Sequence, residues 1–175
     1  LTGGLDAEKY LAHSAHPWAP ACNVIYRRSI FKAIGGFDER YLNYEYCDLH
    51  LRMRHHSDLV FKHEPRALVL HWHRSTWRQY WHQQFFYGRG YGQFLWNYRD
   101  QFHWEPWREV KAWGQLVGLA IRAAWPGQDD RSIVRCGLFI KQFAQHLGFI
   151  STYYNRAERA RWLNQSTASL VTSGG

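Results

Sequence analysis

The chain lacks the short motifs that mark several large enzyme classes. Its 175 residues contain no Walker loop, no GxGxxG fingerprint, no GxSxG elbow and no HExxH zinc motif. Each of these motifs positions a phosphate, a nucleophile or a metal through a fixed local geometry. Their absence excludes these local routes to nucleotide binding, ester hydrolysis and zinc catalysis, so candidate site residues have to be sought across longer spacings.

Cysteine and long apolar runs are also scarce. The three cysteines, Cys22, Cys47 and Cys136, are widely spaced and form no CxxC pair. This pattern indicates free thiols in a reducing compartment rather than a disulfide framework. Uncharged apolar stretches such as Ala112 to Ile121 are too short to span a bilayer. The chain begins without Met, and we expect residues 1–19 to be an entry loop within a longer protein.

Charge is plentiful but not clustered. The formal net charge is +8, and basic side chains exceed acidic ones both in residues 1–100 and in the remainder. Proteins that bind nucleic acid usually gather Lys and Arg on one face or in one run, so this spread argues against a nucleic-acid partner. The 10 Trp, 11 Tyr and 10 Phe residues suit stacking on sugars or bases, or a membrane interface. An aromatic nucleic-acid binder therefore stays as a rival interpretation.

Hydrophobic patterning predicts an α/β chain. Short apolar runs at 21–26, 59–61 and 67–70 predict strands. Helices are predicted over 29–34, 44–55 and 75–87, with the glycine-rich segment 88–92 loosening the backbone. Apolar periodicity predicts two amphipathic helices over 107–125 and 132–154. We divide the chain into an entry loop (1–19), a first part (20–100), a helical extension (101–163) and a disordered tail (164–175).

Two acids at the start of the 44–55 helix are the leading catalytic candidates. Glu45 and Asp48 lie three residues apart and share a helix face, close enough to act as a base or to bind a polyhydroxyl ligand. The alternative is that they only complement the helix dipole. His71 and His73 alternate along an extended segment, so only one of them could easily join a given metal site.

Several motifs follow one another in a characteristic order. They are Asn23, Arg27-Arg28, Gly35-Gly36-Phe37-Asp38-Glu39, Glu45-Tyr46-Cys47-Asp48-Leu49 with Arg52, and the run from Ala67 to His71. This set, over residues 20–92, resembles the acceptor-side, C-terminal half of the catalytic domain in family 2 glycosyltransferases. These are inverting nucleotide-sugar enzymes with a GT-A fold, so the resemblance implies a partial GT-A domain followed by amphipathic helices.

The resemblance implies a role for each part of the motif set. It implies that the base is Glu45 or Asp48, and that Mg²⁺ or Mn²⁺ is bound with the help of His71. Arg suits a diphosphate leaving group, although surface pairing with carboxylates is the alternative. The residues assigned to the diphosphate are Arg28 and Arg74. The residues assigned to the acceptor are Asn23, Gly36, Phe37, Asp38 and Trp72.

The expected function is therefore sugar transfer from a nucleotide-sugar donor to a hydroxyl of a saccharide or lipid-linked acceptor, in bacterial surface polysaccharide or glycolipid synthesis. The resemblance places such a protein in the cytoplasm, peripheral on the inner face of the plasma membrane, with its amphipathic helices on the lipid. Two departures stand against it: Tyr46 occupies the position of the usual catalytic Asp, and the nucleotide-binding half with its DxD motif is absent from these residues. A catalytically inactive saccharide or membrane-surface binding module is thus the alternative.

Overall fold

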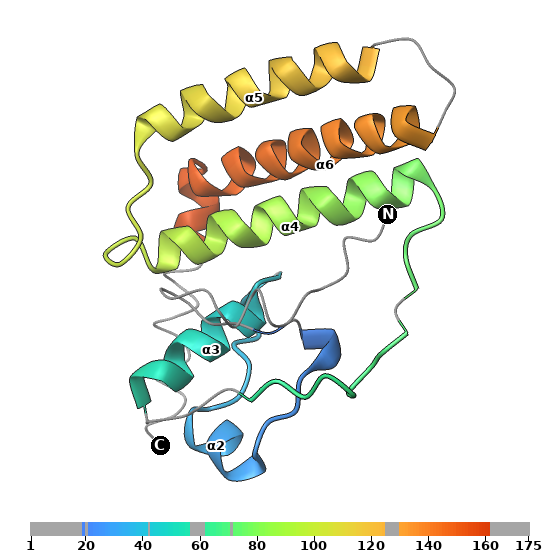
Figure 1. Cartoon of the computed structure of the whole chain (residues 1–175). Coiled ribbons are helices and arrows are strands. Elements are labelled where there is room, and N and C mark those ends of the chain that lie inside the picture. Colours follow the sequence, from blue (N-terminus) through green and yellow to red (C-terminus); the bar gives the residue numbers. More distant parts are fainter. Residues whose placement is uncertain are drawn as a thin grey trace. The chain divides into compact units, whose positions relative to one another are not determined.

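The computed structural model describes residues 19, 21–41, 43–56, 62–70, 72–124 and 130–161. These residues belong to two compact units, Leu1–His73 and Arg74–Gly175, and each unit is described by itself. The first unit contains the 3₁₀ turn η1 (Ala21–Asn23) and the helices α2 (Arg28–Ala33) and α3 (Glu45–His56). The second contains the helices α4 (Trp77–Asn97), α5 (Pro106–Ala124) and α6 (Asp130–Tyr153) (Figure 1).

The prediction of an α/β chain with a partial GT-A domain is wrong, because the described residues contain helices and no strand. Segment 21–26 begins as η1 and continues as irregular chain, and segment 67–70 is irregular. A strand needs a neighbour to complete its backbone hydrogen bonds, and no described segment supplies one. Each run leaves a large apolar side chain in solvent: Ile25 is 96% exposed and Leu70 is 96% exposed. The run at 59–61 lies outside the described residues.

The second unit is built around α6. Helix α6 packs against both α4 and α5, and Ala144 and Phe149 of α6 are buried there. Figure 1 shows these helices side by side, with α6 in the middle. Helix α4 begins after Thr76, whose hydroxyl oxygen accepts a hydrogen bond from the backbone N–H of Gln79, as at a typical N-cap. No described helix is both long and apolar enough to cross a membrane.

The glycine-rich segment 88–92 does not loosen the backbone as expected, because it lies inside α4. A Cβ atom on Gly88 would stand 1.9 Å from the backbone oxygen of Gln145 in α6. Conversely, a Cβ atom on Gly148 of α6 would stand 2.1 Å from the backbone oxygen of Phe85 in α4. These glycines therefore let two helix backbones approach more closely than any side chain would allow.

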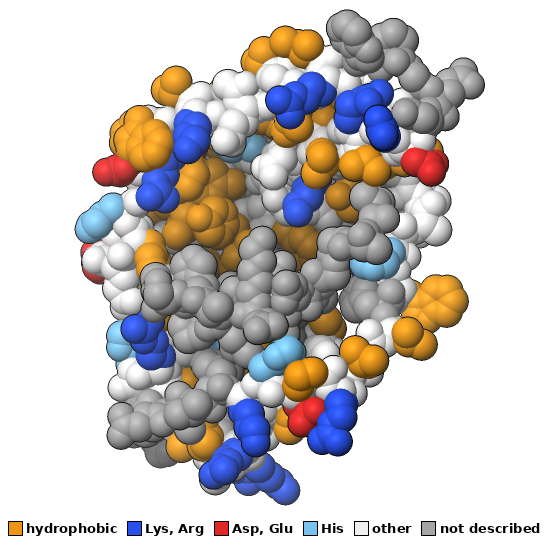
Figure 2. All heavy atoms as spheres, in the orientation of Figure 1, with side chains coloured by type: hydrophobic (Ala, Val, Ile, Leu, Met, Phe, Trp, Pro, Cys, Tyr) orange, Lys and Arg blue, Asp and Glu red, His pale blue; other side chains and the backbone are white. Residues whose placement is uncertain are grey.

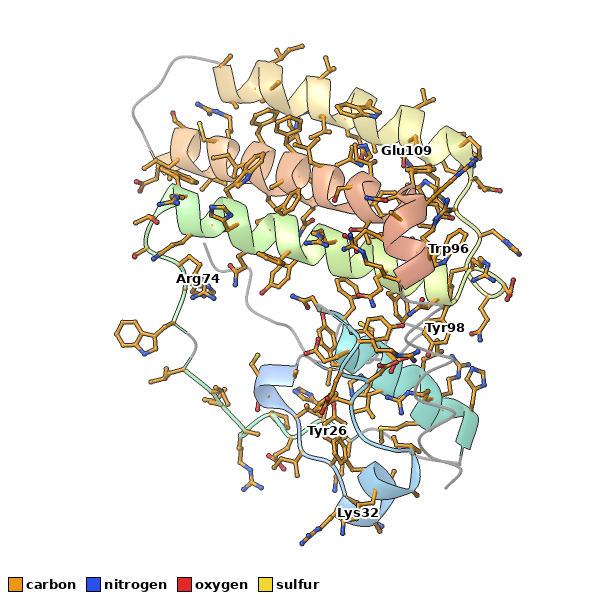
Figure 3. All side chains as sticks on the ribbon, turned by 180° about the vertical axis from the view of Figure 1, so that it is seen from behind. Tyr26, Lys32, Arg74, Trp96, Tyr98 and Glu109 are labelled. Carbon is orange, nitrogen blue, oxygen red and sulfur yellow. The ribbon has the colours of Figure 1, made fainter. Side chains whose placement is uncertain are left out.

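The Glu109 carboxylate connects the start of α5 to the last turns of α6. The Glu109 carboxylate accepts a hydrogen bond from the Trp104 indole N–H at 2.9 Å and one from the Tyr154 hydroxyl at 3.4 Å. The Nε2 atom of His146 lies 3.1 Å from the second Glu109 oxygen, at ion-pair distance but without the alignment of a hydrogen bond. Glu109 thus lies between α5 and α6 (Figure 3) and holds the first turn of α5 in place.

We predict that Gly88→Ala destabilises the second unit by about 1–3 kcal/mol or more, since the new methyl group meets a backbone oxygen that cannot move aside alone. Gly114→Ala in α5 is the matched control, because a Cβ at Gly114 meets nothing within 4 Å. It should stabilise the helix by up to about 1 kcal/mol. Thermal unfolding followed by far-UV circular dichroism measures both effects. Equal midpoints for the two variants would contradict the close backbone contact.

Candidate functional site

Most residues of the site predicted from the sequence belong to the first unit, and the two predicted catalytic acids lie in the first turn of α3. Tyr44, directly before α3, has a positive φ of 69°, which L side chains rarely adopt. Two contacts hold it there: its backbone N–H donates to the Asn43 side-chain oxygen at 2.8 Å, and its carbonyl accepts from the Asp48 N–H at 3.1 Å. This strained residue sets the direction in which α3 begins and therefore where Glu45 lies.

Arg52 of α3 makes a set of contacts that we call the Arg52 bridge. Its guanidinium donates to the Ile34 carbonyl at 2.6 Å and to the Gly36 carbonyl at 2.7 Å. The same group donates from Nε to the Asp48 carboxylate at 2.9 Å and forms an ion pair with it at 2.7 Å. One planar cation therefore fastens the Gly-Gly loop to the helix that carries the acids.

The loop held by the Arg52 bridge begins with a Schellman motif at the end of α2. The Gly36 N–H donates to the Phe31 carbonyl and the Gly35 N–H donates to the Lys32 carbonyl, at 2.9 and 3.1 Å. Both glycines have positive φ values, 79° for Gly35 and 69° for Gly36. A Cβ at Gly36 would also lie 3.1 Å from the Phe31 ring. The Gly-Gly pair is thus required by the turn itself.

Asp38, the predicted acceptor ligand, is held by Arg40. The Arg40 guanidinium donates to both Asp38 oxygens, at 2.8 Å through Nε and 2.6 Å through Nη2, and the Arg40 backbone N–H donates at 3.0 Å. Burial acts to raise the pKa of the Asp38 carboxyl, but the hydrogen bonds and charge of Arg40 outweigh it and lower the pKa. Asp38 is therefore an oriented, ionised carboxylate beside Phe37, whose side chain is 39% exposed.

The two acids of α3 have different surroundings although they share a face. Asp48 is 4% exposed, and its carboxylate is engaged by Arg52. Glu45 is half-buried in the first turn of α3, and no group among the described residues donates a hydrogen bond to it or forms an ion pair with it. Of the two predicted catalytic acids, Glu45 is thus the carboxylate available to a ligand.

The two residues between these acids are neutral. Burial raises the pKa of the Tyr46 phenol well above its ordinary value, and nearby Cys47, Tyr44 and Glu45 raise it further. Burial also raises the pKa of the Cys47 thiol to about 12. A protonated phenol is a poor base and a protonated thiol is a poor nucleophile at neutral pH. Tyr46 therefore cannot take over the role of the Asp that the resemblance implies at this position.

The first unit also contains a buried histidine, His50, which the sequence analysis did not single out. His50 is 2% exposed; its Nδ1 atom accepts from the Ala19 backbone N–H at 3.2 Å, and its Nε2 atom lies 2.8 Å from the Tyr26 hydroxyl. Because Nδ1 accepts, neutral His50 carries its proton on Nε2 and donates it to Tyr26, which is labelled in Figure 3. Burial lowers the pKa of His50 to about 4. Its position among the apolar residues of α3 gave no distinct sequence signal.

The other predicted site residues are only partly brought together. The Asn23 side chain donates to the Ala67 carbonyl at 2.9 Å and so joins the first motif to the last. Arg28 is exposed at the start of α2, and Trp72 is 94% exposed. Arg74 belongs to the second unit. The roles of these residues in binding the acceptor or the diphosphate stay predictions.

A metal site is not assembled by the described residues. They contain no group of three or more His, Cys, Asp or Glu side chains that could hold an ion. The predicted ligand His71 lies outside the described residues. The described residues alone therefore supply no complete ligand set for Mg²⁺ or Mn²⁺, and no chemical step is assigned to a metal below.

Comparison with known proteins finds similarity over part of the chain. The chain is 35% identical over 78 residues to the "Pre-mycofactocin glycosyltransferase" of two Mycobacterium tuberculosis strains, CDC 1551 / Oshkosh and ATCC 25618 / H37Rv. This match relates the chain to a glycosyltransferase. It covers 45% of this chain and 16% of each relative, so the chain spans a small part of the proteins it matches. No protein-family model and no solved structure matches the chain.

We predict that Arg52→Lys destabilises the first unit by about 2–4 kcal/mol, since an ammonium group cannot replace the fork and leaves the buried Asp48 charge and loop carbonyls poorly paired. Arg66→Lys is the matched control: Arg66 also pairs with a carboxylate, Glu64, but is 89% exposed. Because both groups of this pair lie in solvent, Arg66→Lys should leave the stability nearly unchanged. Amide hydrogen exchange in α3 and residues 34–40 measures the difference. Unchanged protection in Arg52→Lys would refute the bridge.

We predict that His50 makes the first unit less stable as the pH falls from 6.5 to 4. Unfolded His50 takes up a proton near its ordinary pKa of 6.5, whereas folded His50 resists down to about 4. The unfolded state thus binds more protons within this window, and up to roughly 3 kcal/mol of stability is lost. Urea unfolding at a series of pH values should show this slope in the native chain and a shallower one in His50→Gln. The same slope in both chains would rule out His50 as its source.

Proposed function

We propose that the chain forms the acceptor side of an inverting glycosyltransferase of family 2. The observation that supports this proposal is the arrangement around α3. Glu45, a carboxylate without a hydrogen-bond or ion-pair partner among the described residues, begins the helix, and the Arg52 bridge fixes the loop of Phe37 and Asp38 to the same helix. The relationship to a glycosyltransferase over 78 residues agrees with it. The donor is a nucleotide-sugar, and the acceptor is a hydroxyl of a saccharide or lipid-linked sugar.

In this proposal Glu45 is the general base. The acceptor oxygen attacks the anomeric carbon of the donor, a new C–O bond forms, and the bond from that carbon to the diphosphate breaks with inversion. The hydroxyl proton goes to the Glu45 carboxylate, and the bonding electrons leave with the diphosphate. Asp48 is the less suitable base, because protonating it would break its ion pair with Arg52.

The remaining polar residues of the unit bind and orient the substrates. Asp38 is ionised and oriented by Arg40, and as an acceptor of hydrogen bonds it suits the hydroxyl groups of a sugar. Exposed aromatic rings, Phe37 and Trp72, offer faces on which a sugar ring can stack. Arg28 and Arg74 remain the proposed partners of the diphosphate. We retain Mg²⁺ or Mn²⁺ as the proposed cofactor of the complete enzyme, without a step of its own here.

We also propose where the reaction takes place. A lipid-linked acceptor in surface polysaccharide or glycolipid synthesis would be met at the inner face of the plasma membrane, with the protein bound peripherally. The abundance of exposed Trp and Arg side chains in the second unit supports a surface of this kind.

The second candidate function is a saccharide-binding module without catalysis. The observation that favours it is Tyr46, a half-buried neutral phenol at the position of the usual catalytic Asp. Such a module would still use Asp38, Phe37 and Trp72 to hold a sugar.

We predict that Glu45→Gln in the intact protein lowers the rate of sugar transfer by at least about 100-fold, since general-base catalysis typically contributes that much. The amide has nearly the same shape but cannot take up the proton, so binding of the acceptor should change little. Steady-state transfer rates and acceptor affinity measure the two effects. Full activity of Glu45→Gln would overturn its assignment as the base.

Tyr46→Asp distinguishes the two candidate functions. A large gain in transfer indicates an enzyme weakened by the phenol, whereas unchanged sugar binding with no transfer in either form favours the binding module. Tyr46→Phe is the control, because it removes the hydroxyl without adding a carboxylate and should leave the transfer rate of the native protein unchanged.

A further inference from the structure

Two arginine side chains lie against one tryptophan near the end of α4. The guanidinium carbon of Arg159 stands 4.1 Å from the centre of the Trp96 ring, and that of Arg99 stands 4.8 Å from it. Arg99 also donates from Nη1 to the Trp96 carbonyl at 3.1 Å. A guanidinium attracted to a ring keeps further N–H groups at its edge, where they can bind oxygen acceptors. Trp96 therefore brings together two cations that lie far apart in the sequence.

The position of Arg159 is fixed by the chain just after α6. The Asn155 side-chain oxygen accepts hydrogen bonds from the backbone N–H groups of Ala157 and Glu158, at 3.0 and 3.3 Å, and so caps the helical residues 156–161. The Glu158 carboxylate lies 3.4 Å from Nη2 of Arg89 in α4, with both side chains largely buried. This cap and this ion pair hold the helical segment against α4 and direct Arg159 to Trp96.

Tyr153, in the last turn of α6, adds a neutral donor to the two cations. Its ring meets the Trp96 ring edge-on, with ring centres 6.0 Å apart, and Figure 3 labels Trp96 at this place. Burial raises the pKa of the Tyr153 phenol, and the charges of Arg159 and Arg99 act in the opposite direction. Both cations therefore lie near a hydroxyl group that keeps its proton at neutral pH. We call Trp96, Arg99, Tyr153 and Arg159 the Trp96 cluster.

The Trp96 cluster carries two positive charges, and no described carboxylate pairs with either of them. Glu158, the acid next to Arg159, is engaged by Arg89 and Arg161 instead. Like charges held near one ring repel each other, and an anion bound between them would remove this cost. Figure 2 shows basic and apolar side chains next to one another at the left of the second unit, where Figure 1 draws the end of α6 and the start of α5.

We propose that the Trp96 cluster binds a phosphate group with two negative charges, as in a phosphate monoester or a diphosphate. The planar forks of two guanidinium groups match the oxygens of such a group in geometry and in charge. The Tyr153 hydroxyl supplies a further hydrogen bond. A carboxylate has one charge and two oxygens, so it satisfies only one fork. This inference does not depend on the sugar transfer proposed above, whose diphosphate is assigned to Arg28 and Arg74.

The test is isothermal titration calorimetry of the full chain with three soluble anions. They are inorganic pyrophosphate, inorganic phosphate and acetate, compared at constant ionic strength and slightly above neutral pH, where phosphate is mostly a dianion. We expect saturable binding of pyrophosphate and phosphate, and binding of acetate that is weaker by at least about tenfold. The indole N–H resonance of Trp96 should shift during the pyrophosphate titration, which places the ligand at the cluster.

Substitutions of single arginines locate the site. Arg159→Gln and Arg99→Gln should each weaken pyrophosphate binding by at least about tenfold, as expected for the loss of charge-assisted hydrogen bonds. Arg161→Gln is the matched control. It removes the same charge from the same helical segment, but Arg161 is 71% exposed and pairs with Glu158. This variant should bind pyrophosphate nearly as well as the native chain.

Two conservative variants separate the chemistry from the charge. Arg159→Lys keeps the charge but loses the planar fork, so it should bind pyrophosphate less tightly than the native chain and more tightly than Arg159→Gln. Tyr153→Phe should cause a smaller loss than either glutamine variant, because it removes one neutral donor. Circular dichroism checks that each variant keeps its helices. If Arg159→Gln loses helix content, Arg99→Gln decides, because Arg99 is exposed and follows the end of α4.

Three outcomes would overturn the proposal. The first is the absence of saturable binding of pyrophosphate and phosphate by the native chain. The second is an equal loss of binding in Arg99→Gln, Arg159→Gln and Arg161→Gln, which would mean that only the net charge of +8 attracts the anions. The third is a Trp96 indole resonance that stays in place while the ligand binds, since the ligand would then lie elsewhere on the chain.

Discussion

The first unit depends on one cation placed among three oxygen acceptors. Arg52 forms an ion pair with buried Asp48. It also donates hydrogen bonds to the Ile34 and Gly36 carbonyls, which lie in a loop outside regular secondary structure. A buried carboxylate without such a partner is costly, and so is a buried carbonyl. The bridge also explains why two acids on the same helix face differ in availability. Asp48 holds the loop through its ion pair with Arg52, whereas half-buried Glu45 has no such partner among the described residues.

The second unit gives α5 a rigid base. Glu109 links its first turn to α6 through His146 and to the preceding segment through Trp104, and Leu116 is buried midway along α5. A helix anchored at its start and along one side keeps the opposite side in a constant orientation.

Helices were easier to predict from this sequence than strands. The acids early and the arginines late in 44–55 predicted α3 closely, and the i, i+4 spacing of Asp48 and Arg52 already contains their ion pair. The runs at 21–26 and 67–70 were misread because β-branched and apolar residues favour strands only where a neighbouring strand pairs with them. The glycines at 88–92 were misread because glycine serves both loose turns and close helix contacts. The link from His50 to the Ala19 N–H crosses 31 residues and follows from no local pattern.

The close approach of α4 and α6 at Gly88 and Gly148 limits which substitutions this pair of helices can accept. At most buried positions a larger side chain can be accommodated by a smaller one opposite. Here each glycine faces the main-chain oxygen of the other helix, at Gln145 and at Phe85, and a main-chain atom is the same in every residue. No substitution at Gln145 or Phe85 can therefore make room for a side chain at Gly88 or Gly148. Only a displacement of one whole helix would restore the fit, and α6 is also held on its other side by α5.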